Sequence, residues 1–290
     1  MISVIIPTFK NKQLLIDNLN HNLPYLQDCE IIIVNDDPTE SLKKDIKKFK
    51  KIILFENKKN LGFGQSINIG AKKARGNYLM FLNNDVQLSN DNYQLAINHF
   101  ENNENMFSVS FAQTEKNGTI VGKNKIYWQK GFFQHSSVNN LNQGINGWAE
   151  GGSCIIDKKK FKILGGFDPI YSPFYWVDID LSYRAWKTGY ENIFNPEIKV
   201  IHHHESTIGK YFSNSRIKSI AFRNQLLFIW KNINTNNLIK EHVIYLVPAV
   251  LKGGLPFISG FFQALFKLPQ IRKLNNNIKL SDLEIFNKFL

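Results

Sequence analysis

The strongest constraint on the fold is a regular alternation of short apolar runs with helical patterns along residues 1–85. Four runs, three of them rich in β-branched side chains, predict buried strands at residues 2–6, 30–34, 51–55 and 78–82. The segments between them predict helices at residues 13–26, 42–49 and 64–75. Strands that alternate with helices form a mostly parallel sheet with helices on both faces, so the sequence predicts an α/β fold.

Polar side chains follow three of these predicted strands, at residues 7–8, 35–37 and 83–85. The carboxyl ends of parallel strands share one edge of a sheet, and ligands bind at that edge. We therefore expect the three polar clusters to converge in one crevice, although they are far apart in the sequence.

Asp85 is the one carboxylate of the third cluster. A carboxylate directly after a buried strand can bind Mg²⁺ or Mn²⁺, and the ion would then bridge the protein and the phosphates of a substrate. The alternative is an ordinary Asn-Asp turn, because these residues also favour turns.

A glycine-containing loop that includes Asn60 and Gly62 opens the third predicted helix. Its backbone N–H groups could approach a phosphate, or its glycines could only punctuate the loop. The loop does not have the strand context of the dinucleotide fingerprint, which excludes a nicotinamide-binding site.

The second half of the chain contains two further candidate groups. Asp178 and Asp180 stand at the start of a helix predicted over residues 177–187, where one could be a general base or both could simply favour the helix N-terminus. In an extended strand, His202 and His204 would share one face and could ligate a metal, or they could lie in a solvated loop.

The net charge of +12 is concentrated in the C-terminal region. Residues 209–290 contain 12 basic and 3 acidic side chains, which account for +9 of the total. Such an excess indicates an anionic partner, either nucleic acid or a membrane surface. The two cysteines, Cys29 and Cys154, lack metal-ligand spacing and suggest no disulfide framework, which favours a reducing, cytoplasmic compartment. The short first apolar run has the pattern of a strand and not of a signal peptide.

Residues 243–273 have the pattern of an interfacial amphipathic helix. Between Glu241 and Lys267 the only formal charge is Lys252, but proline and glycine interrupt the run, which disfavours a transmembrane helix. The aromatic residues of this segment are grouped with aliphatic ones instead of alternating with basic ones, which argues against nucleic-acid binding. A packed helix or a homodimer interface is the alternative. Helical spacing places one apolar set on a single face: Phe257, Ile258, Phe261, Phe262, Leu265, Phe266 and Leu268, with Lys267, Arg272 and Lys273 beside them.

The order of these motifs resembles that of the family 2 glycosyltransferases of the GT-A fold, above all their rhamnosyltransferase-like branch in bacteria. The resemblance is carried by residues 3–10, 34–40, 60–89, 151–190, 200–207 and 222–232. It implies a GT-A catalytic domain at residues 1–208, with a nucleotide-binding half at 1–100 and an acceptor-side half at 101–208. A basic, amphipathic helical region would follow at residues 209–290.

The resemblance also implies roles for individual residues. In the donor site, Pro7 and Thr8 would line the nucleotide pocket, Asp36 would accept a hydrogen bond from the base, and Asp85 would bind the metal. Asp178 would be the catalytic base. His202, with His204 as second choice, would contact the metal or the diphosphate. The remaining implied contacts are Asn60, Gly62 and Asn84 with the donor, and Trp148, Gly151, Gly152, Trp176 and Asp180 on the acceptor side.

Two departures from the family pattern matter. Val177 stands where the family has a glutamate, and asparagines occupy the first two positions of the Asn83-Asn84-Asp85 motif, so the metal should arrive with the donor. The implied enzyme is an inverting, metal-dependent hexosyltransferase of polysaccharide synthesis, using dTDP-rhamnose or a UDP-sugar. Its acceptor would be a glycan on polyprenyl diphosphate, at the inner face of the cell membrane. The alternatives are an inactive sugar-nucleotide-binding relative and a basic nucleic-acid-binding protein.

Overall fold

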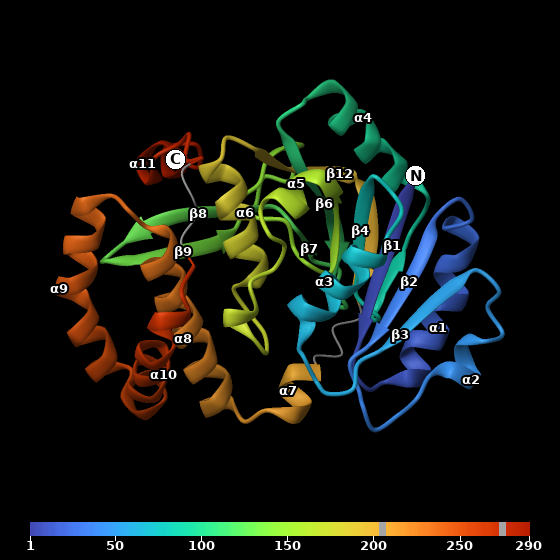
Figure 1. The fold of residues 1–290 in the computed structure, drawn as a ribbon. Coiled ribbons are helices and arrows are strands. Elements are labelled where there is room, and N and C mark those ends of the chain that lie inside the picture. The colour runs from blue at the N-terminus through green and yellow to red at the C-terminus, as the bar shows by residue number, and fades with distance from the viewer. Residues whose placement is uncertain (203–206, 273–276) are drawn as a thin grey trace.

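The computed structural model describes residues 1–202, 207–272 and 277–290, and it is built around one mixed sheet (Figure 1). Parallel strands form one half of the sheet, in the order β3 (Ile52–Glu56), β2 (Glu30–Asn35), β1 (Ile2–Thr8) and β4 (Tyr78–Leu82). The order continues with β11 (Ser153–Asp157), β6 (Met106–Thr114), β12 (Glu191–His202) and β10 (Gly144–Ile145), while β5 (Val86–Leu88) pairs with β12 and β7 (Ile120–Val121) with β6.

Strand direction decides which chain segments meet at the ligand-binding edge. β11 runs antiparallel to both β4 and β6, while β12 is parallel to β6. The carboxyl ends of β1, β2, β4, β6 and β12 therefore lie at the same edge as the amino end of β11. Residues 150–152, just before β11, are thus brought to the edge where the N-terminal polar clusters end.

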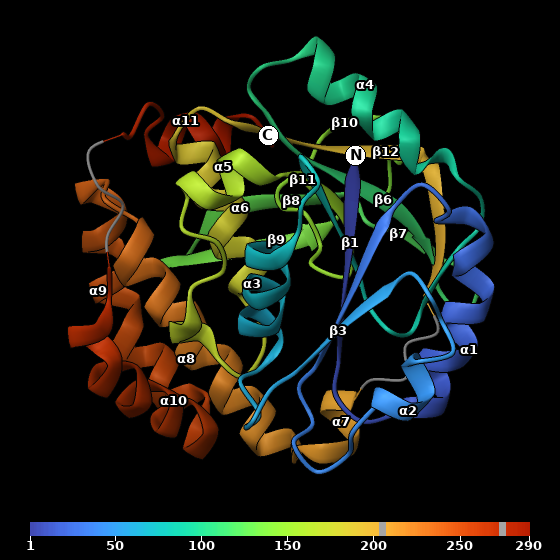
Figure 2. The ribbon, with the colours of Figure 1, turned by 45° about the vertical axis from the view of Figure 1, so that its right-hand side comes forward.

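Helices cover both faces of the sheet, because alternate side chains of each strand point to opposite sides. On one face Val4 and Ile6 pack with α1 (Lys12–Asn22), α2 (Lys43–Ile46) and α4 (Leu95–Asn102). On the other face Ile5 packs with α3 (Phe63–Lys73), α5 (Lys158–Ile163) and α6 (Val177–Lys187). Figure 2 shows α1 and α3 on opposite sides of β1. The predicted mixed α/β architecture is therefore confirmed.

The C-terminal helices pack against a two-stranded hairpin beside the sheet. The hairpin consists of β8 (Asn124–Gln129) and β9 (Phe132–Ser137), and the helices are α7 (Thr207–Tyr211), α8 (Asn214–Asn232), α9 (Asn236–Lys252), α10 (Gly254–Lys267) and α11 (Asp282–Asn287). The ring of Phe133 lies 4.4 Å from that of Phe228 and 5.8 Å from that of Phe286, measured between centroids. The apolar core is thus continuous across residue 208, and the domain division predicted there stays a prediction.

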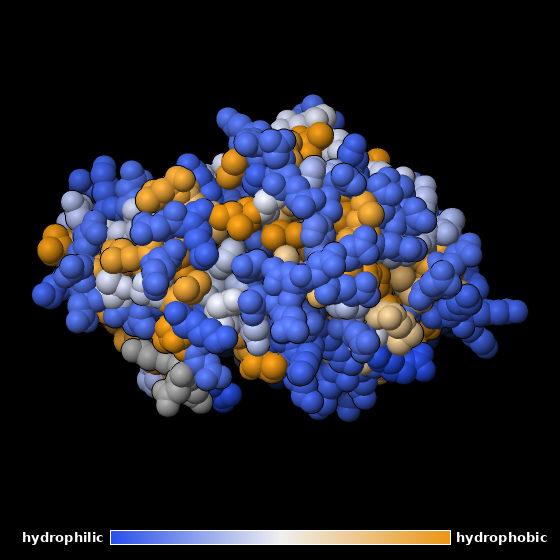
Figure 3. Space-filling view, turned by 90° about the horizontal axis from the view of Figure 1, so that it is seen from above, coloured by the Kyte–Doolittle hydropathy of each residue, from blue (hydrophilic) through white to orange (hydrophobic). Residues whose placement is uncertain are grey.

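Short 3₁₀ turns complete the described elements: Leu23–Tyr25, Asn92–Gln94, Pro169–Tyr171 and Leu268–Gln270. At the end of the molecule near α4 and α11, hydrophilic side chains dominate the surface, with apolar ones scattered among them (Figure 3). No described helix is long and apolar enough to cross a membrane.

The apolar side chains predicted on one face over residues 257–268 differ in their exposure. Phe257 stacks on Phe222, with ring centroids 4.4 Å apart, and Phe261 contacts Trp230 at 6.5 Å. These two side chains are therefore packing residues. Phe262 and Phe266 point outward and remain exposed. Helical spacing alone could not show this division, because α10 is apolar on two sides.

Candidate active site

Three polar clusters meet at the carboxyl edge of the sheet, as the strand order predicts. Thr8 is the meeting point: its carbonyl accepts from the Asp36 N–H at 2.8 Å, and its hydroxyl accepts from Asn84 Nδ2 at 3.0 Å. Asn18 of α1 fixes the third cluster by donating to the Asn84 carbonyl at 2.7 Å. Segments that are far apart in the sequence are thus joined by direct hydrogen bonds.

Asp36 orders the loop that carries the predicted donor residues. Its buried carboxylate accepts from the backbone N–H groups of Leu61 and Gly62, at 2.8 and 2.7 Å, and from Asn57 Nδ2 at 2.8 Å. Burial raises the pKa of Asp36, and these donors only partly oppose that effect. The loop is thereby folded against the strand edge, with Asn60 exposed beside it.

Gly62 is required where this loop turns. Its φ of +85° lies in the left-handed region, and a Cβ there would stand 2.9 Å from the carbonyl oxygen of Pro173. The predicted donor loop therefore touches residues 171–176, the segment that precedes Asp178.

Asp85 and His202 face one another across the edge of the sheet. They are brought together because β5, directly after Asp85, pairs with the end of β12. The imidazole Nε2 lies 3.3 Å from Asp85 Oδ1. That oxygen is buried and accepts no aligned hydrogen bond within the described part of the chain. Burial lowers the pKa of His202, but the carboxylates of Asp85, Glu115 and Glu150 outweigh it and leave the pKa raised.

A chain of hydrogen bonds fixes which nitrogen of His202 faces Asp85. The Glu150 carboxylate can only accept, and it accepts from Gln113 Nε2 and, at 3.0 Å, from Asn124 Nδ2. The other end of the Gln113 amide, Oε1, must then accept from His202 Nδ1, at 2.9 Å. In the neutral imidazole the lone pair of Nε2 therefore points to Asp85.

This pair fits a divalent cation that is shared with a ligand. Among residues 1–202, 207–272 and 277–290, no group of three or more His, Cys, Asp or Glu side chains could hold a metal alone. Asp85 and His202 offer one oxygen and one nitrogen, a donor set acceptable to Mn²⁺ or Mg²⁺ when phosphate oxygens complete the coordination. His204, the second choice, lies outside the described residues.

Asp178 occupies the first turn of α6, beside the same edge. Burial raises the pKa of its carboxyl to about 6, the nearby Glu150 carboxylate adds to this, and the backbone N–H groups of Ile179 and Gly151 oppose it. Gly151 leaves room for the Phe63 ring, which a Cβ there would approach to 2.8 Å, and Asp178 Cβ lies at ordinary contact distance, 3.9 Å from that Cβ position. A carboxylate with such a pKa can both take a proton and be charged at neutral pH.

The loop before Asp178 has an unusual backbone that α8 holds in place. Tyr175 and Trp176 have φ values of 66° and 72°, a conformation costly for side chains with a Cβ. Asn224 Nδ2 lies within 2.8–3.1 Å of the carbonyl oxygens of Tyr171, Phe174 and Tyr175. The entry into α6, and with it the position of Asp178, is therefore set from α8.

The profile described as Glycosyl transferase family 2 matches residues 3–162, more than half of the chain. The chain belongs to glycosyl transferase family 2. This membership agrees with the resemblance described above, and the matched segment contains Asp36, Asp85 and Gly151, while Asp178 and His202 lie beyond it.

Two curated relatives and one solved structure illustrate the similarity. An uncharacterized glycosyltransferase of Rickettsia bellii (strain RML369-C) is 31% identical over 124 residues, which cover 41% of this chain and 18% of the relative. The N-acetylglucosaminyl-diphospho-decaprenol L-rhamnosyltransferase of Mycobacterium tuberculosis (strain CDC 1551 / Oshkosh) is 33% identical over 64 residues, 22% of this chain and 20% of the relative. This chain thus spans about a fifth of the length of these relatives.

The crystal structure of GalNAc-T7 with UDP, GalNAc and Mn²⁺ superposes with a TM-score of 0.67 at 16% identity. The superposition covers 100% of this chain and 58% of GalNAc-T7. At this identity the likeness shows the fold, and it confirms the predicted GT-A-like architecture.

Asp180, which the family pattern places on the acceptor side, is a buried link between α6 and α8. Its carboxylate is fully buried and accepts from Tyr171, Arg184, Lys231 and Asn232 at 2.8–3.1 Å. Burial opposes ionisation, but these cationic and amide partners hold the pKa of Asp180 well below its usual range. Asp180 therefore joins α6 to α8, while its contact with an acceptor stays a prediction.

The other residues expected on the acceptor side make contacts within the protein. Trp148 and Trp176 are buried on either side of His135, whose ring centroid is 5.0 Å from Trp148 and 5.7 Å from Trp176. Gly152 leaves room for Asn83, whose side chain a Cβ at this position would strike, and its carbonyl accepts from the Asn83 N–H at 2.9 Å. These contacts support the strand edge, while contact with an acceptor stays a prediction.

Val177, which stands where the family pattern has a glutamate, is a packing residue. It is buried against α3, where a Cβ at Gly64 would lie 3.6 Å from Val177 Cγ1 and 3.1 Å from Phe167 Cβ. An ionised side chain in this apolar contact would be costly.

Sequence reasoning missed three residues that shape the site: Gln113, Glu150 and Asn224. Gln113 stands at the end of β6, and a polar residue closing a buried strand at the ligand edge was a usable signal. Glu150 carried the same kind of signal, as the one acidic residue beside Gly151 and Gly152. Asn224 gave none, because its partners are about 50 residues away.

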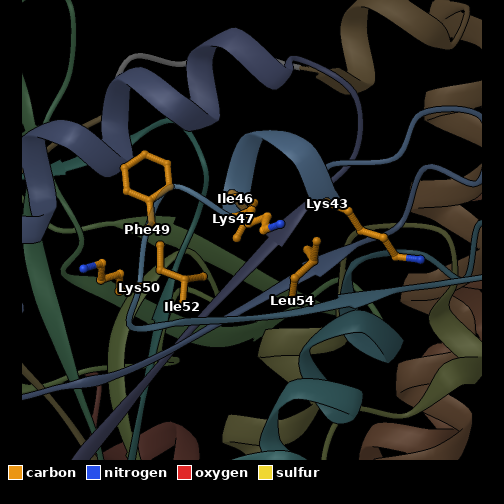
Figure 4. A pocket seen from close by; sticks show the side chains of 7 residues that line it. All are labelled: Lys43, Ile46, Lys47, Phe49, Lys50, Ile52 and Leu54. Atoms are coloured by element: carbon orange, nitrogen blue, oxygen red, sulfur yellow. The ribbon is translucent and has the colours of Figure 1, made fainter.

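A hollow of about 300 Å³ on the flank of the sheet is unrelated to this site (Figure 4). It is lined by residues of α2 and of β3, with Lys43 and Ile52 among them. β3 is the outermost strand, separated from β4 by β2 and β1. The hollow therefore lies away from Asp85.

Proposed function

We propose that this family 2 protein is an inverting glycosyltransferase that moves a hexose from a nucleotide-diphosphate donor to an acceptor hydroxyl. The observation that carries the proposal is the shared edge at which Asp85 faces His202 and Asp178 has a raised pKa. Asp85 and His202 suit a metal-bound diphosphate, and Asp178 suits proton abstraction. A binding protein would not need a carboxylate held at a pKa near 6.

In the proposed reaction Asp178 accepts the proton of the acceptor hydroxyl. The acceptor oxygen forms a bond to the anomeric carbon while the bond from that carbon to the diphosphate oxygen breaks, which inverts the configuration. His202 and Asp85 would hold a divalent ion, which would supply positive charge against the departing diphosphate. Thr8, Asp36 and the turn at Gly62 would bind the nucleotide.

For the donor, dTDP-rhamnose comes first and a UDP-sugar is the alternative. The rhamnose assignment is supported by the partial match to the M. tuberculosis enzyme, whose name specifies an acceptor on diphospho-decaprenol. We extend the same acceptor class, a glycan on polyprenyl diphosphate, to this protein. Synthesis of a cell-surface polysaccharide at the cytoplasmic face of the membrane would follow. The free cysteines Cys29 and Cys154 agree with that compartment.

Membrane contact through residues 243–272 is supported by the exposed apolar side chains of α9 and α10. Leu251, Leu255 and Phe266 are 69%, 81% and 82% exposed. Lys252 and Arg272 are exposed in the same segment and could meet anionic headgroups. Lys273 lies outside the described residues.

The metal site is tested with Asp85→Ala and with Asp91→Ala, an exposed aspartate on the same connection, as matched control. Titration of UDP and dTDP by calorimetry, with Mn²⁺ or Mg²⁺ and with EDTA, should show metal-dependent binding in the wild type and in the control. Asp85→Ala should lose the metal-dependent part. Unchanged affinity of Asp85→Ala in the presence of metal would refute the role of this carboxylate.

A further inference from the structure

A second hollow, of about 490 Å³, opens between α8 and α10. Seven of its eleven lining residues are polar or basic, and none of the lining residues is acidic. Two arginines and four serines contribute to it: Arg216, Arg223, Ser213, Ser215, Ser219 and Ser259. Such a lining suits an anion.

Helical spacing explains how the polar groups converge. Arg216, Ser219 and Arg223 stand at positions i, i+3 and i+7 of α8, on one face, and Ser259 and Gln263 stand four residues apart on α10. Gln263 Nε2 bridges the helices by donating to Ser219 Oγ at 3.1 Å and to Ser259 Oγ at 3.0 Å.

The helices approach closely at Gly260, where a Cβ would lie 2.6 Å from the Ser219 carbonyl oxygen. Ser219 and Ser259, which line the hollow, stand beside this contact.

Arg223 has a basic neighbour in Lys267. Arg223 is buried, and burial lowers its pKa to about 10, which still leaves the guanidinium charged at neutral pH. Burial also lowers the pKa of Lys267, with the Arg223 charge as a further cause. An anion in the hollow would relieve the repulsion between these cations.

One wall of the hollow belongs to residues 171–176, the loop that precedes Asp178. Pro173 of this loop lines the hollow, and its carbonyl oxygen also packs against Gly62 of the donor loop. Arg223 Nη2 donates to the carbonyl of the neighbouring Ser172 at 2.6 Å. A ligand held here would lie one loop away from Asp178 and from the donor.

The opposite wall leads to the exposed apolar surface. Leu255 and Ser259 line the hollow and stand on the same face of α10 as Phe262 and Phe266, at spacings of four, three and four residues. All four are exposed. The hollow therefore combines a polar, cationic interior with an apolar surface that begins at its rim. We call this surface, formed by Leu255, Phe262 and Phe266, the apolar track.

We propose that this hollow binds the diphosphate of an isoprenoid-linked acceptor, with the hydrocarbon chain on the apolar track. The assignment rests on the proposed glycosyltransferase function and adds a second phosphate site to it, distinct from the metal-dependent donor site. The two cationic side chains match the charge of a diphosphate, and Leu255, Phe262 and Phe266 match the chain that follows it. A free phosphate ester would use the interior but not the track.

The test uses the full-length protein and three probes: farnesyl diphosphate, inorganic pyrophosphate and farnesol. Binding is measured in EDTA, with and without excess UDP, so that the donor site does not contribute. Farnesyl diphosphate should bind more tightly than either other probe, and UDP should not displace it. Arg216→Ala should weaken this binding about tenfold, in line with the loss of one charge-assisted contact. Arg216 is exposed, so the variant should fold.

Lys218→Ala is the matched control, because Lys218 is exposed on α8 but faces away from the hollow at two residues from Arg216. It should bind farnesyl diphosphate within twofold of the wild type. Ser259→Trp should weaken binding by filling the rim. Equal losses in the Arg216 and Lys218 variants would overturn the site in favour of non-specific attraction.

Other results would also overturn the assignment. Equal binding of pyrophosphate and farnesyl diphosphate would show a free-phosphate site, and equal binding of farnesol would show an apolar surface only. Dimers in which the track is covered by a second copy, with no farnesyl diphosphate binding, would assign the face to self-association. Absence of metal-dependent UDP binding would count against the proposed function alone, so the two failures can be told apart.

Discussion

Replacing the proposed catalytic base should make the protein more stable at neutral pH and leave its stability unchanged in acid. The reason is that Asp178 is held as a charged group in surroundings that favour its neutral form. Burial raises its pKa from 3.8 to about 6, and the Glu150 carboxylate adds to this. The folded state therefore binds the proton of Asp178 more tightly than the unfolded state does.

The magnitude follows from the size of that pKa difference. A tenfold change in proton affinity corresponds to about 1.4 kcal/mol, so the charged form costs the folded state about 3 kcal/mol. This cost is absent below pH 4, grows as the pH rises to 6, and is complete above that value. Asp178→Asn removes the charge, and its amide oxygen can still accept from the Ile179 N–H, which lies 3.0 Å from Asp178 Oδ1.

Thermal unfolding of wild type and Asp178→Asn, between pH 4 and pH 8 in EDTA and without donor, measures the effect. The variant should gain several degrees in Tm relative to the wild type at pH 8 and nothing at pH 4. Glu150→Gln should reduce the difference, because it removes one cause of the raised pKa. A Tm difference that does not change with pH would refute the reasoning.

The same group predicts the pH dependence of transfer. The deprotonated fraction of Asp178 falls about tenfold between pH 7 and pH 5, and kcat/KM should fall with it. Asp178→Asn should abolish transfer while preserving binding of the nucleotide donor. Transfer by this variant near the wild-type rate would remove Asp178 from the mechanism.

Two further predictions concern the contacts between α6 and α8. Asn224→Ala should lower kcat by roughly tenfold or more with donor affinity unchanged. The left-handed backbone at Tyr175 and Trp176 costs roughly 1–2 kcal/mol per residue, and in this variant the loop loses the hydrogen bonds from Asn224 that hold it. A variant with wild-type kcat and Tm would show that the loop keeps its conformation without Asn224. Asp180→Ala should cost about 3–5 kcal/mol in urea unfolding at pH 7, since it leaves Arg184 and Lys231 as buried charges. The destabilisation by Asp180→Ala should shrink below about pH 4. The pKa of Asp180 is lowered in the folded protein, so the stability that its carboxylate contributes is lost on acidification, the opposite of Asp178. A loss of unfolding free energy below about 1 kcal/mol at pH 7 would contradict the structural role of Asp180.

Much of the sheet could be predicted from local sequence. Short apolar runs, three of them rich in β-branched residues, located β1 to β4 within two residues of their bounds. β1, β2 and most of β4 are buried on both faces, while β3 is half-buried at the edge of the sheet. The helix predicted at residues 42–49 shortens to Lys43–Ile46, since its lysine-rich sequence offers few side chains to bury. The position and direction of β11 could not be predicted, because antiparallel insertion between β4 and β6 depends on contacts distant in sequence.

The candidate site, too, could be predicted from the sequence only in part. Asp85 and Asp178 could be found from their places after a strand and at a helix start. Asp180 shares the helix-start pattern but serves packing, and only its burial among Arg184, Lys231 and Asn232 separates the two aspartates. A pattern that combines capping with catalysis cannot tell which carboxylate faces a ligand.

The geometry makes the proposed catalytic site depend on the C-terminal region. The family profile ends at residue 162, yet Asp178 is positioned by a loop whose backbone conformation is held from α8. The same helix presents Arg223 to Ser172 on one side of that loop and lines the proposed phosphate site on the other. Anchoring an acceptor between α8 and α10 would therefore act on the loop that sets the base. Because Arg223 donates its hydrogen bond to the loop and also lines the phosphate site, acceptor binding and base position share one side chain.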